Sequence, residues 1–199
     1  MYLGHNLGQD TLAPNDDLVQ QIRLAPSPTS KKQLRSFLGL VGYYRAFVPH
    51  FAAIAAPLTD LTKKGSPDKL VWTETHEQAF QALKEHACTQ PVLCLPDVNK
   101  PFILQTDASS DGIGAILLQE VNWVKHPVAF ASKRLLPRER NFSTIEREAL
   151  AIVWGVQKFQ NYLIGVHFTL KTDHHALQYL DTAKFQNSRI MRWSLLLLP

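Results

Sequence analysis

Apolar residues recur every three or four positions in the first half of the chain, which is the spacing of one helix face. The clearest run is Leu34, Phe37, Leu38, Val41 and Tyr44. Ser30 is the predicted N-cap, and Gln33 follows it at the spacing of a capping box. We expect Pro49 to end this helix and residues 51–61 to form a second one.

A third helix is predicted from residue 74 onwards. Thr73 is its expected N-cap, and Glu74 and Glu77 are acidic residues that favour the positive end of a helix dipole. Apolar residues then follow at helical spacing, at Ala79, Phe80 and Leu83. The first half of the chain therefore predicts a compact helical unit.

From residue 100 the pattern becomes that of strands. Three hairpin-linked strands are predicted at 102–106, 113–119 and 127–133. A long helix over 141–165, ended by Gly165, separates them from a fourth strand at 167–172 and from a helix starting within 175–181. This order predicts an α/β domain with a mixed sheet, in which three strands are antiparallel and the fourth is parallel to its neighbour.

Acidic residues stand at the ends of two of these strands. Asp107 closes the first strand and Asp173 the fourth. A right-handed crossover through the long helix would bring both to the carboxyl edge of the sheet, where open α/β sheets bind ligands. Two carboxylates aimed at one point repel each other unless a cation lies between them, and hard oxygen ligands favour Mg²⁺. As structural alternatives, Asp107 could be a turn residue and Asp173 an N-cap.

The long helix offers two glutamates as a third ligand. On a helical projection, Glu148 lies about 60° from the centre of the apolar stripe and Glu146 about 100° from it. Ser143 and Glu146 also form an S-x-x-E capping box. Glu148 is therefore the predicted ligand, and Glu146 the predicted cap.

Composition narrows the class of protein. With 45% hydrophobic residues, the 199-residue chain can bury a sizeable core, and its net charge of +4 suits a polyanionic partner. Cys88 and Cys94 lack zinc-site spacing and are expected to be reduced thiols. The sequence shows no signal peptide and no apolar run of membrane-span length, so we expect an intracellular protein, cytoplasmic or nuclear, without a membrane partner.

Several motifs in a fixed order carry a family resemblance. They include "YLGH", "LRSFLGLVGYYRAFV", "ILQTDASSDGIGAILLQ", "NFSTIEREALAIVWGVQKF" and "TLKTDHHAL". With these motifs the chain resembles, over almost its whole length, the pol polyprotein of gypsy-type LTR retrotransposons, from the end of reverse transcriptase into RNase H. The resemblance implies the end of the palm with its primer grip at 1–25, a thumb-like helical unit at 26–65, a connection at 66–99 and a C-terminally truncated RNase H-like domain at 100–199.

The resemblance also implies a reaction. The acidic site of the family would map onto Asp107, Glu148 and Asp173, which would hold two Mg²⁺ ions, or Mn²⁺, for endonucleolytic cleavage of the RNA strand of an RNA–DNA hybrid. Template-primer nucleic acid and the remainder of a pol polyprotein are the implied partners. On the thumb-like helix, backbone phosphate contacts are predicted for basic residues that could equally form a solvated face, namely Lys31, Lys32 and Arg35.

Departures from the family pattern leave alternatives open. The polymerase aspartates lie upstream in this family, so no polymerase activity is expected. A fifth strand, a fourth metal-ligating aspartate and a final helix would follow Pro199, so the RNase H activity of this chain is uncertain. One alternative is a catalytically inactive nucleic-acid-binding remnant of a transposable element. An integrase-type core is disfavoured, because there the glutamate follows both aspartates, whereas Glu148 precedes Asp173.

Overall fold

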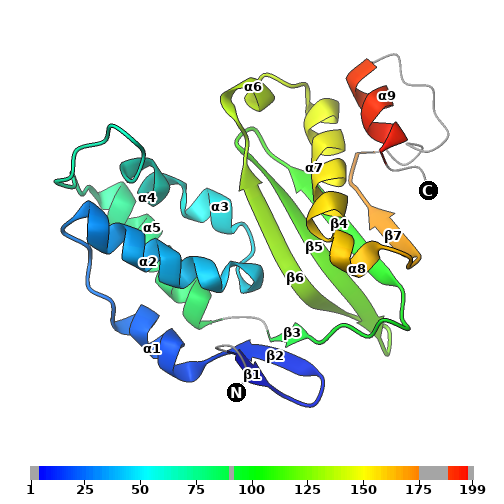
Figure 1. Cartoon of the computed structure of the whole chain (residues 1–199), viewed down its shortest axis with the longest axis horizontal. Helices are drawn as coiled ribbons and strands as arrows, with labels where there is room; N and C mark the ends of the chain where they lie inside the picture. The colour runs from blue at the N-terminus through cyan, green and yellow to red at the C-terminus, as the bar shows by residue number, and fades with distance from the viewer. Residues whose placement is uncertain (1–4, 90–91, 175–187, 197–199) are drawn as a thin grey trace. The chain divides into compact units, whose positions relative to one another are not determined.

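The computed structural model describes residues 5–89, 92–174 and 188–196, and it divides the chain into two compact units, Met1–Leu95 and Pro96–Pro199. Each unit has its own secondary structure (Figure 1). Among the described residues, no helix combines the length and the apolar character needed to cross a membrane. Cys88 and Cys94 are free thiols of intermediate burial.

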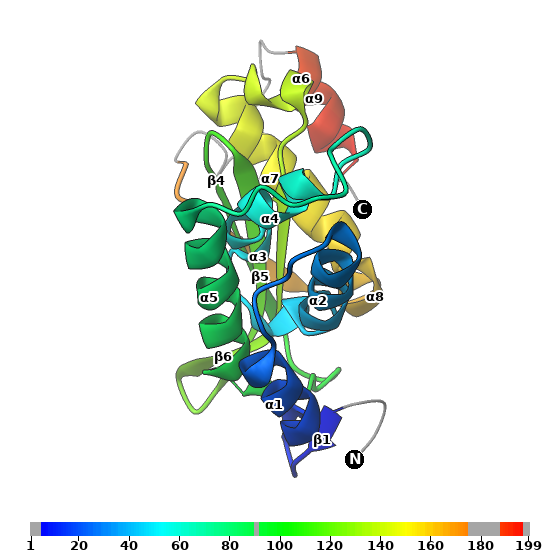
Figure 2. The same ribbon diagram turned by 90° about the vertical axis from the view of Figure 1, so that its left-hand side faces the viewer.

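The first unit combines a small sheet with helices. Its strands are β1 (His5–Leu7), β2 (Thr11–Pro14) and β3 (Leu93–Cys94), which pair antiparallel in that order. Its helices are α1 (Asp16–Leu24), α2 (Lys31–Tyr43), the 3₁₀ helix η1 (Arg45–Phe47), α3 (Phe51–Ile54), α4 (Ala56–Leu61) and α5 (Glu74–Cys88). Helix α5 contacts α1, α2, α3 and α4 (Figure 2). The predicted compact helical unit is therefore present.

Helix α2 begins where its cap predicts. Ser30 Oγ accepts the backbone N–H of Gln33 at 3.3 Å. The Gln33 side chain, however, accepts the N–H of Thr29 at 2.8 Å, one residue before the partner that a capping box uses. The helix ends at Tyr43, well before Pro49, because the chain turns into η1.

The helix predicted over residues 51–61 is two short helices. They are separated at Ala55, and Pro57 lies in the first turn of the second. Pro57 has no backbone N–H to donate to the preceding turn, so the first helix cannot continue through it. Helix α5 has its predicted N-cap position at Thr73, where the His76 side chain accepts the Thr73 N–H at 3.1 Å.

The second unit is built on a four-stranded sheet in the order β6-β5-β4-β7. Its strands are β4 (Phe102–Ala108), β5 (Gly112–Val121), β6 (Val124–Arg134) and β7 (Phe168–Lys171), and its helices are α6 (Pro137–Arg140), α7 (Thr144–Lys158), α8 (Gln160–Leu163) and α9 (Ser188–Leu195). Strands β4, β5 and β6 are antiparallel, and β7 is parallel to β4. The predicted mixed α/β sheet is confirmed. The helix predicted within 175–181 lies outside the described residues.

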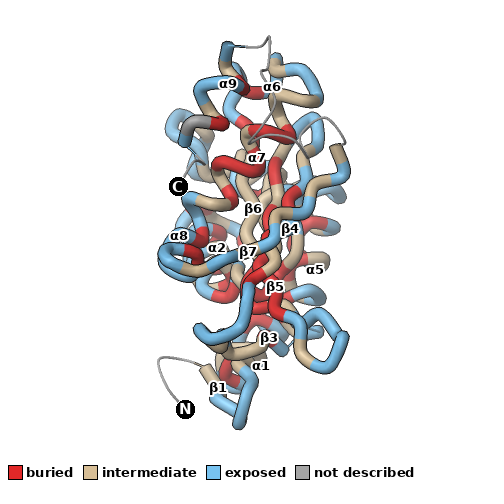
Figure 3. Tube along the Cα trace, turned by 90° about the vertical axis from the view of Figure 1, so that its right-hand side faces the viewer, coloured by how far each residue is buried: buried red, intermediate tan, exposed pale blue. Residues whose placement is uncertain are grey.

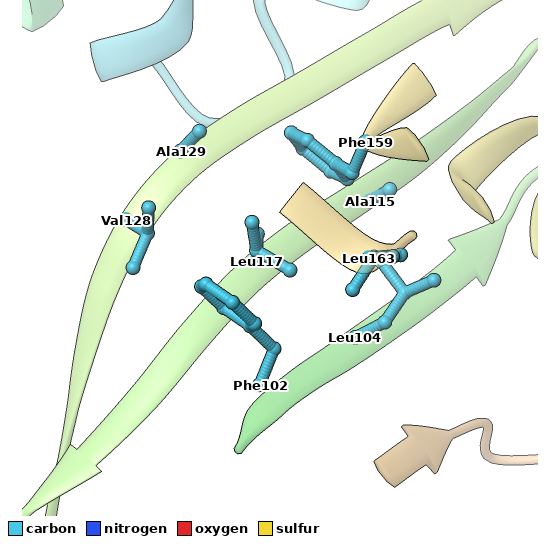
Figure 4. Packing of buried hydrophobic residues seen from close by; sticks show 8 residues of the cluster. All are labelled: Phe102, Leu104, Ala115, Leu117, Val128, Ala129, Phe159 and Leu163. Atoms are coloured by element: carbon cyan, nitrogen blue, oxygen red, sulfur yellow. The ribbon is translucent and has the colours of Figure 1, made fainter. Parts of the chain in front are cut away.

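Helix α7 covers one face of this sheet. The core cluster on this face also involves the segment after α7 and contains Phe102, Leu104, Ala115, Leu117, Val128, Ala129, Phe159 and Leu163 (Figure 4). Gly155 permits a close approach, since a Cβ there would lie 3.1 Å from Thr106 Cγ2 and 3.3 Å from the Ala115 Cβ. Buried residues follow β4, β5 and α7 (Figure 3). The helix is thereby held close to the central strands.

The predicted long helix ends in stages. Helix α7 stops at Lys158, Phe159 separates it from the single turn α8, and Gly165 follows with φ 73°. A left-handed φ favours glycine, which agrees with the predicted stop. The chain then returns along β4 as β7.

Candidate metal centre

Strand pairing brings Asp107 and Asp173 to the same edge of the sheet. Parallel strands β4 and β7 are in register through Gln105 and Lys171. Asp107 stands two residues beyond Gln105, and Asp173 two residues beyond Lys171. Both aspartates are exposed. The crossover geometry expected from the sequence is therefore present.

The third carboxylate comes from α7. Glu148 is only 4% exposed, and its Oε1 accepts the backbone N–H of Ala108 at 3.2 Å. Its Oε2 is buried without a hydrogen-bond partner among the described groups. One carboxylate oxygen from each of Asp107, Glu148 and Asp173 lies within 4.8 Å of the others.

Three carboxylates this close together repel one another, which destabilises the folded protein unless a cation is bound. Burial, followed by the negative charges of Asp173 and Asp107, raises the pKa of Glu148 to about 7, while the N–H of Ala108 opposes the rise. A divalent cation at the meeting point would offset the repulsion and would provide a partner for the buried Glu148 Oε2. Three oxygen donors match the preference of Mg²⁺ and Mn²⁺ for hard ligands. The residues fit a divalent metal.

Glu146 does not join this cluster. Its Oε2 accepts the Ser143 N–H at 2.9 Å, and its Oε1 pairs with Arg189 Nη1 at 2.6 Å. The Ser143 Oγ accepts the N–H of Glu146 at 3.4 Å, which completes the capping box. The structure thus places Glu146 in the predicted cap at the helix start and Glu148 beside the aspartates, and metal binding by Glu148 stays a prediction.

The three basic residues predicted on the thumb-like helix have different surroundings. Lys31 is buried, and its Nζ donates to the carbonyl oxygens of Lys63 and Ser66, both at 2.9 Å. Lys32 is exposed, and exposed Arg35 donates from Nη2 to the Thr62 carbonyl at 3.2 Å. Lys31 therefore ties the start of α2 to the loop that follows α4. Its predicted phosphate contact, like those of Lys32 and Arg35, stays a prediction.

Sequence reasoning missed two contributors to the geometry of the site. The N–H of Ala108 orients Glu148, and Gly155 lets α7 approach the sheet. A backbone donor leaves no residue-type signal. Gly155, the only glycine between residues 115 and 164, is the signal in the sequence for the close approach of α7.

Comparisons with known proteins identify the family and the fold of the chain. Residues 97–199 match the family model described as the RNase H-like domain found in reverse transcriptase. The chain is 42% identical over 195 residues to the retrovirus-related Pol polyprotein from transposon 297 of Drosophila melanogaster, which covers 96% of the chain and 18% of the relative. It is 40% identical over 203 residues to the retrovirus-related Pol polyprotein from transposon gypsy of the same organism, and the match covers 96% of the chain and 19% of the relative. The chain thus spans about a fifth of the length of these relatives.

Solved structures share the fold at low identity. A foamy viral protease-reverse transcriptase in complex with dsDNA superposes with a TM-score of 0.86 at 21% identity, over 100% of this chain and 42% of the other. A foamy viral protease-reverse transcriptase in complex with an RNA/DNA hybrid superposes with a TM-score of 0.79 at 22% identity, over 98% of this chain and 27% of the other. At such identities the likeness shows the fold alone.

Proposed function

The chain belongs to the family of RNase H-like domains found in reverse transcriptase, and from this premise we propose that it cleaves the RNA strand of RNA–DNA hybrids in a divalent-metal-dependent, endonucleolytic reaction. The observation that carries the proposal is the meeting of three carboxylates, one of them buried with an unpartnered oxygen, at the carboxyl edge of the sheet. Divalent ions held by such a cluster would neutralise negative charge on the phosphate, and phosphodiester hydrolysis requires this neutralisation.

The proposed roles follow from the position of each residue. Asp107, Glu148 and Asp173 would hold the metal, with Mg²⁺ favoured, Mn²⁺ as a substitute and two ions in the complete site. When bound, such ions supply an activated water and neutralise charge on the phosphate oxygens. The N–H of Ala108 holds Glu148 towards the aspartates. The capping box of Ser143 and Glu146 stabilises the start of α7, about one turn before Glu148.

The proposed substrate is an RNA–DNA hybrid or a related template-primer duplex. Structurally similar viral enzymes have been solved with dsDNA and with an RNA/DNA hybrid, and the net charge of +4 suits a polyanion. We further propose that 1–25, 26–65 and 66–99 correspond to palm end, thumb and connection, with the rest of a pol polyprotein as a partner. On the thumb-like helix, exposed Lys32 and Arg35 are the better placed of the predicted phosphate contacts.

Cleavage of a labelled RNA–DNA hybrid tests the proposal. The wild-type chain should cut the RNA strand with Mg²⁺ or Mn²⁺ and not with EDTA. Asp107→Asn should lower the rate at least about 100-fold, because a lost ligand removes several kcal/mol of charge stabilisation. Asp111→Asn is the matched control, since this exposed aspartate in the adjacent β4–β5 turn pairs with Arg140 at 3.6 Å and is outside the cluster.

Two results would contradict the proposal. One is absence of cutting by a folded wild-type protein in either metal, and the other is equal loss in Asp107→Asn and Asp111→Asn. Hybrid binding without cleavage, unchanged by Asp107→Asn, would instead favour the catalytically inactive binding module.

A further inference from the structure

Helix α9 packs against α7 (Figure 1). Its Ile190 is 1% exposed and joins Ala149 of α7 in a buried cluster, against which Leu170 of β7 also packs. Ala149 directly follows Glu148, and Leu170 precedes Asp173 by three residues. Helix α9 therefore lies against the segments that carry two of the three clustered carboxylates.

Arg189 joins α9 to the start of α7. Its Nη1 donates to Glu146 Oε1 at 2.6 Å, and its guanidinium carbon lies 4.1 Å from the centroid of the Phe142 ring. The centroid of this ring is also 6.0 Å from that of Trp193, which is on α9. Phe142 and Glu146 stand on either side of the N-cap residue Ser143. One arginine of α9 thus holds α7 on both sides of its cap.

The Glu146 carboxylate has two tasks. Its Oε2 accepts the Ser143 N–H at 2.9 Å, while its Oε1 takes part in the ion pair with Arg189. A hydrogen bond between a guanidinium and a carboxylate is among the stronger ones in proteins. The Glu146 side chain is only 13% exposed, so water and salt screen this pair less than a pair on the surface. The pair can therefore hold the helix start in place.

Glu148 needs such support. It stands two residues after Glu146, in the part of the helix where fraying begins. The charges of Asp107 and Asp173 repel its carboxylate. The hydrogen bond that it accepts from the Ala108 N–H, at 3.2 Å, is at the long end of the usual range. The direction of this side chain therefore depends on how firmly the start of α7 is held.

We propose that Arg189 is a positioning residue for Glu148. By holding Phe142 and Glu146 it fixes the first turn of α7, so that the next carboxylate along the helix faces the two aspartates. The inference rests on the proposed function, because the metal is expected to bind where the three carboxylates meet. It assigns a task to α9, which follows these carboxylates in the chain and carries none of them.

Charge alone predicts the opposite effect on metal binding. Removing the positive charge of Arg189 near a group of carboxylates should, by Coulomb's law, favour the binding of a cation. Positioning predicts weaker binding, because carboxylates that do not converge cannot share one ion. Arg192 gives the matched control, since it is an exposed arginine on the same helix whose Nε donates to the Ser188 carbonyl at 3.3 Å. Arg192→Gln removes the same charge and keeps Arg189 in place.

Amide hydrogen exchange of the full chain in EDTA, followed by NMR, tests the position of Glu148 directly. The Ala108 N–H is hydrogen-bonded to this side chain, so its exchange reports on whether Glu148 stays in place. Arg189→Gln should speed exchange at Ala108 about 10-fold or more relative to the amides of β5. Arg192→Gln should leave this ratio unchanged.

Calorimetric titration of the folded proteins with Mg²⁺ and with Mn²⁺ measures the consequence. Arg189→Gln should bind either ion about 10-fold more weakly than the wild type, the size of effect typical of residues that orient metal ligands. Arg189→Lys should recover part of the affinity, because it keeps a cation for Glu146 but lacks the planar group that stacks on Phe142. Arg192→Gln should bind at least as tightly as the wild type.

Unchanged exchange at Ala108 in Arg189→Gln would overturn the proposal. Metal binding by Arg189→Gln as tight as that of the wild type, or tighter, would overturn it as well, because charge alone would then account for the result. If Arg189→Gln does not fold, Phe142→Leu decides, since it removes the ring beneath the guanidinium and keeps the ion pair. It should show both effects at about 3-fold, and wild-type behaviour of this variant would count against the proposal.

The two proposals fail in different ways. If the wild type cuts the hybrid with Mg²⁺ while Arg189→Gln keeps wild-type exchange at Ala108 and wild-type metal affinity, only the positioning proposal fails. If the wild type binds no divalent metal and cuts no hybrid, the proposed function fails, and exchange at Ala108 in EDTA still decides whether Arg189 positions Glu148.

Discussion

Replacing Glu148 with glutamine should stabilise the metal-free protein, and only at neutral to alkaline pH. The pKa of this buried carboxyl is raised from 4.5 to about 7 by burial and by the two aspartate charges. A raised folded-state pKa means that the favourable, protonated form is fully present below about 4.5 and that its contribution is lost as the pH rises through about 7. At pH 8 the wild type therefore has a buried negative charge that glutamine lacks.

The size of the effect follows from the difference between the two pKa values. The pKa difference, from 4.5 to about 7, is worth about 1.4 kcal/mol per unit, which gives an upper bound of about 3.5 kcal/mol for the stabilisation by Glu148→Gln at pH 8. At pH 5 the stabilisation should be less than about 1 kcal/mol. Glutamine keeps an oxygen that can accept the Ala108 N–H, and its amide can donate to the aspartates. The geometry of the site is thus retained while the charge is removed.

Urea unfolding in EDTA at about pH 5 and about pH 8, followed by tryptophan fluorescence, measures this difference. Three of the four tryptophans follow residue 96 and so report on the second unit. Added Mg²⁺ should stabilise the wild type and have little effect on Glu148→Gln, because stabilisation requires binding to the folded state. Glu146→Gln is the matched control, and should lose about 1 kcal/mol at both pH values, since it weakens a cap and an ion pair.

The reasoning would be refuted if Glu148→Gln lowered the free energy of unfolding at pH 8 without metal, or changed it equally at both pH values. Either result would mean that burial and the charges of Asp173 and Asp107 do not raise the pKa of Glu148. A Mg²⁺ response of equal size in both proteins would place the metal elsewhere.

Two further predictions concern packing. Gly155→Ala should destabilise the second unit by about 1–3 kcal/mol, because the added methyl group would press on two central strands. Gly39→Ala is the control and should be neutral or stabilising, because an added Cβ there meets nothing within 4 Å. Thermal unfolding of the two variants tests the contrast. Lys31→Met should cost about 1–3 kcal/mol by removing the ammonium that donates to the carbonyls of Lys63 and Ser66. Lys32→Met on the exposed face should change stability by less than about 0.5 kcal/mol in the same assay, and equal effects would contradict the buried role of Lys31.

Much of the second unit could be predicted from local pattern. Its four strands, the start of α7 at Ser143 and the stop near Gly165 follow from alternation, capping and glycine conformation, all of which act over a few residues. The parallel pairing of the fourth strand follows from the handedness of crossovers. Even the choice of Glu148 over Glu146 as the residue beside the aspartates needed only the angle between them on a helix.

Other features could not be predicted, because they depend on neighbours distant in sequence. The burial of Lys31 requires carbonyl groups of Lys63 and Ser66, more than 30 residues away. The early end of α2 at Tyr43 reflects how the short helices fit around α5. Periodicity and Pro49 predicted a longer helix there, but tertiary packing decided where α2 ends.

The sequence by itself determined which acidic residues are candidates for the site and at which edge of the sheet Asp107 and Asp173 should meet, because caps, strand alternation and crossover handedness are local or nearly universal rules. Only the tertiary structure decided how close the three carboxylates lie, that Glu148 is buried with one oxygen unpartnered, and that Arg189 pairs with Glu146. Those properties are set by distance and by access of water, and both arise only when segments distant in sequence pack together.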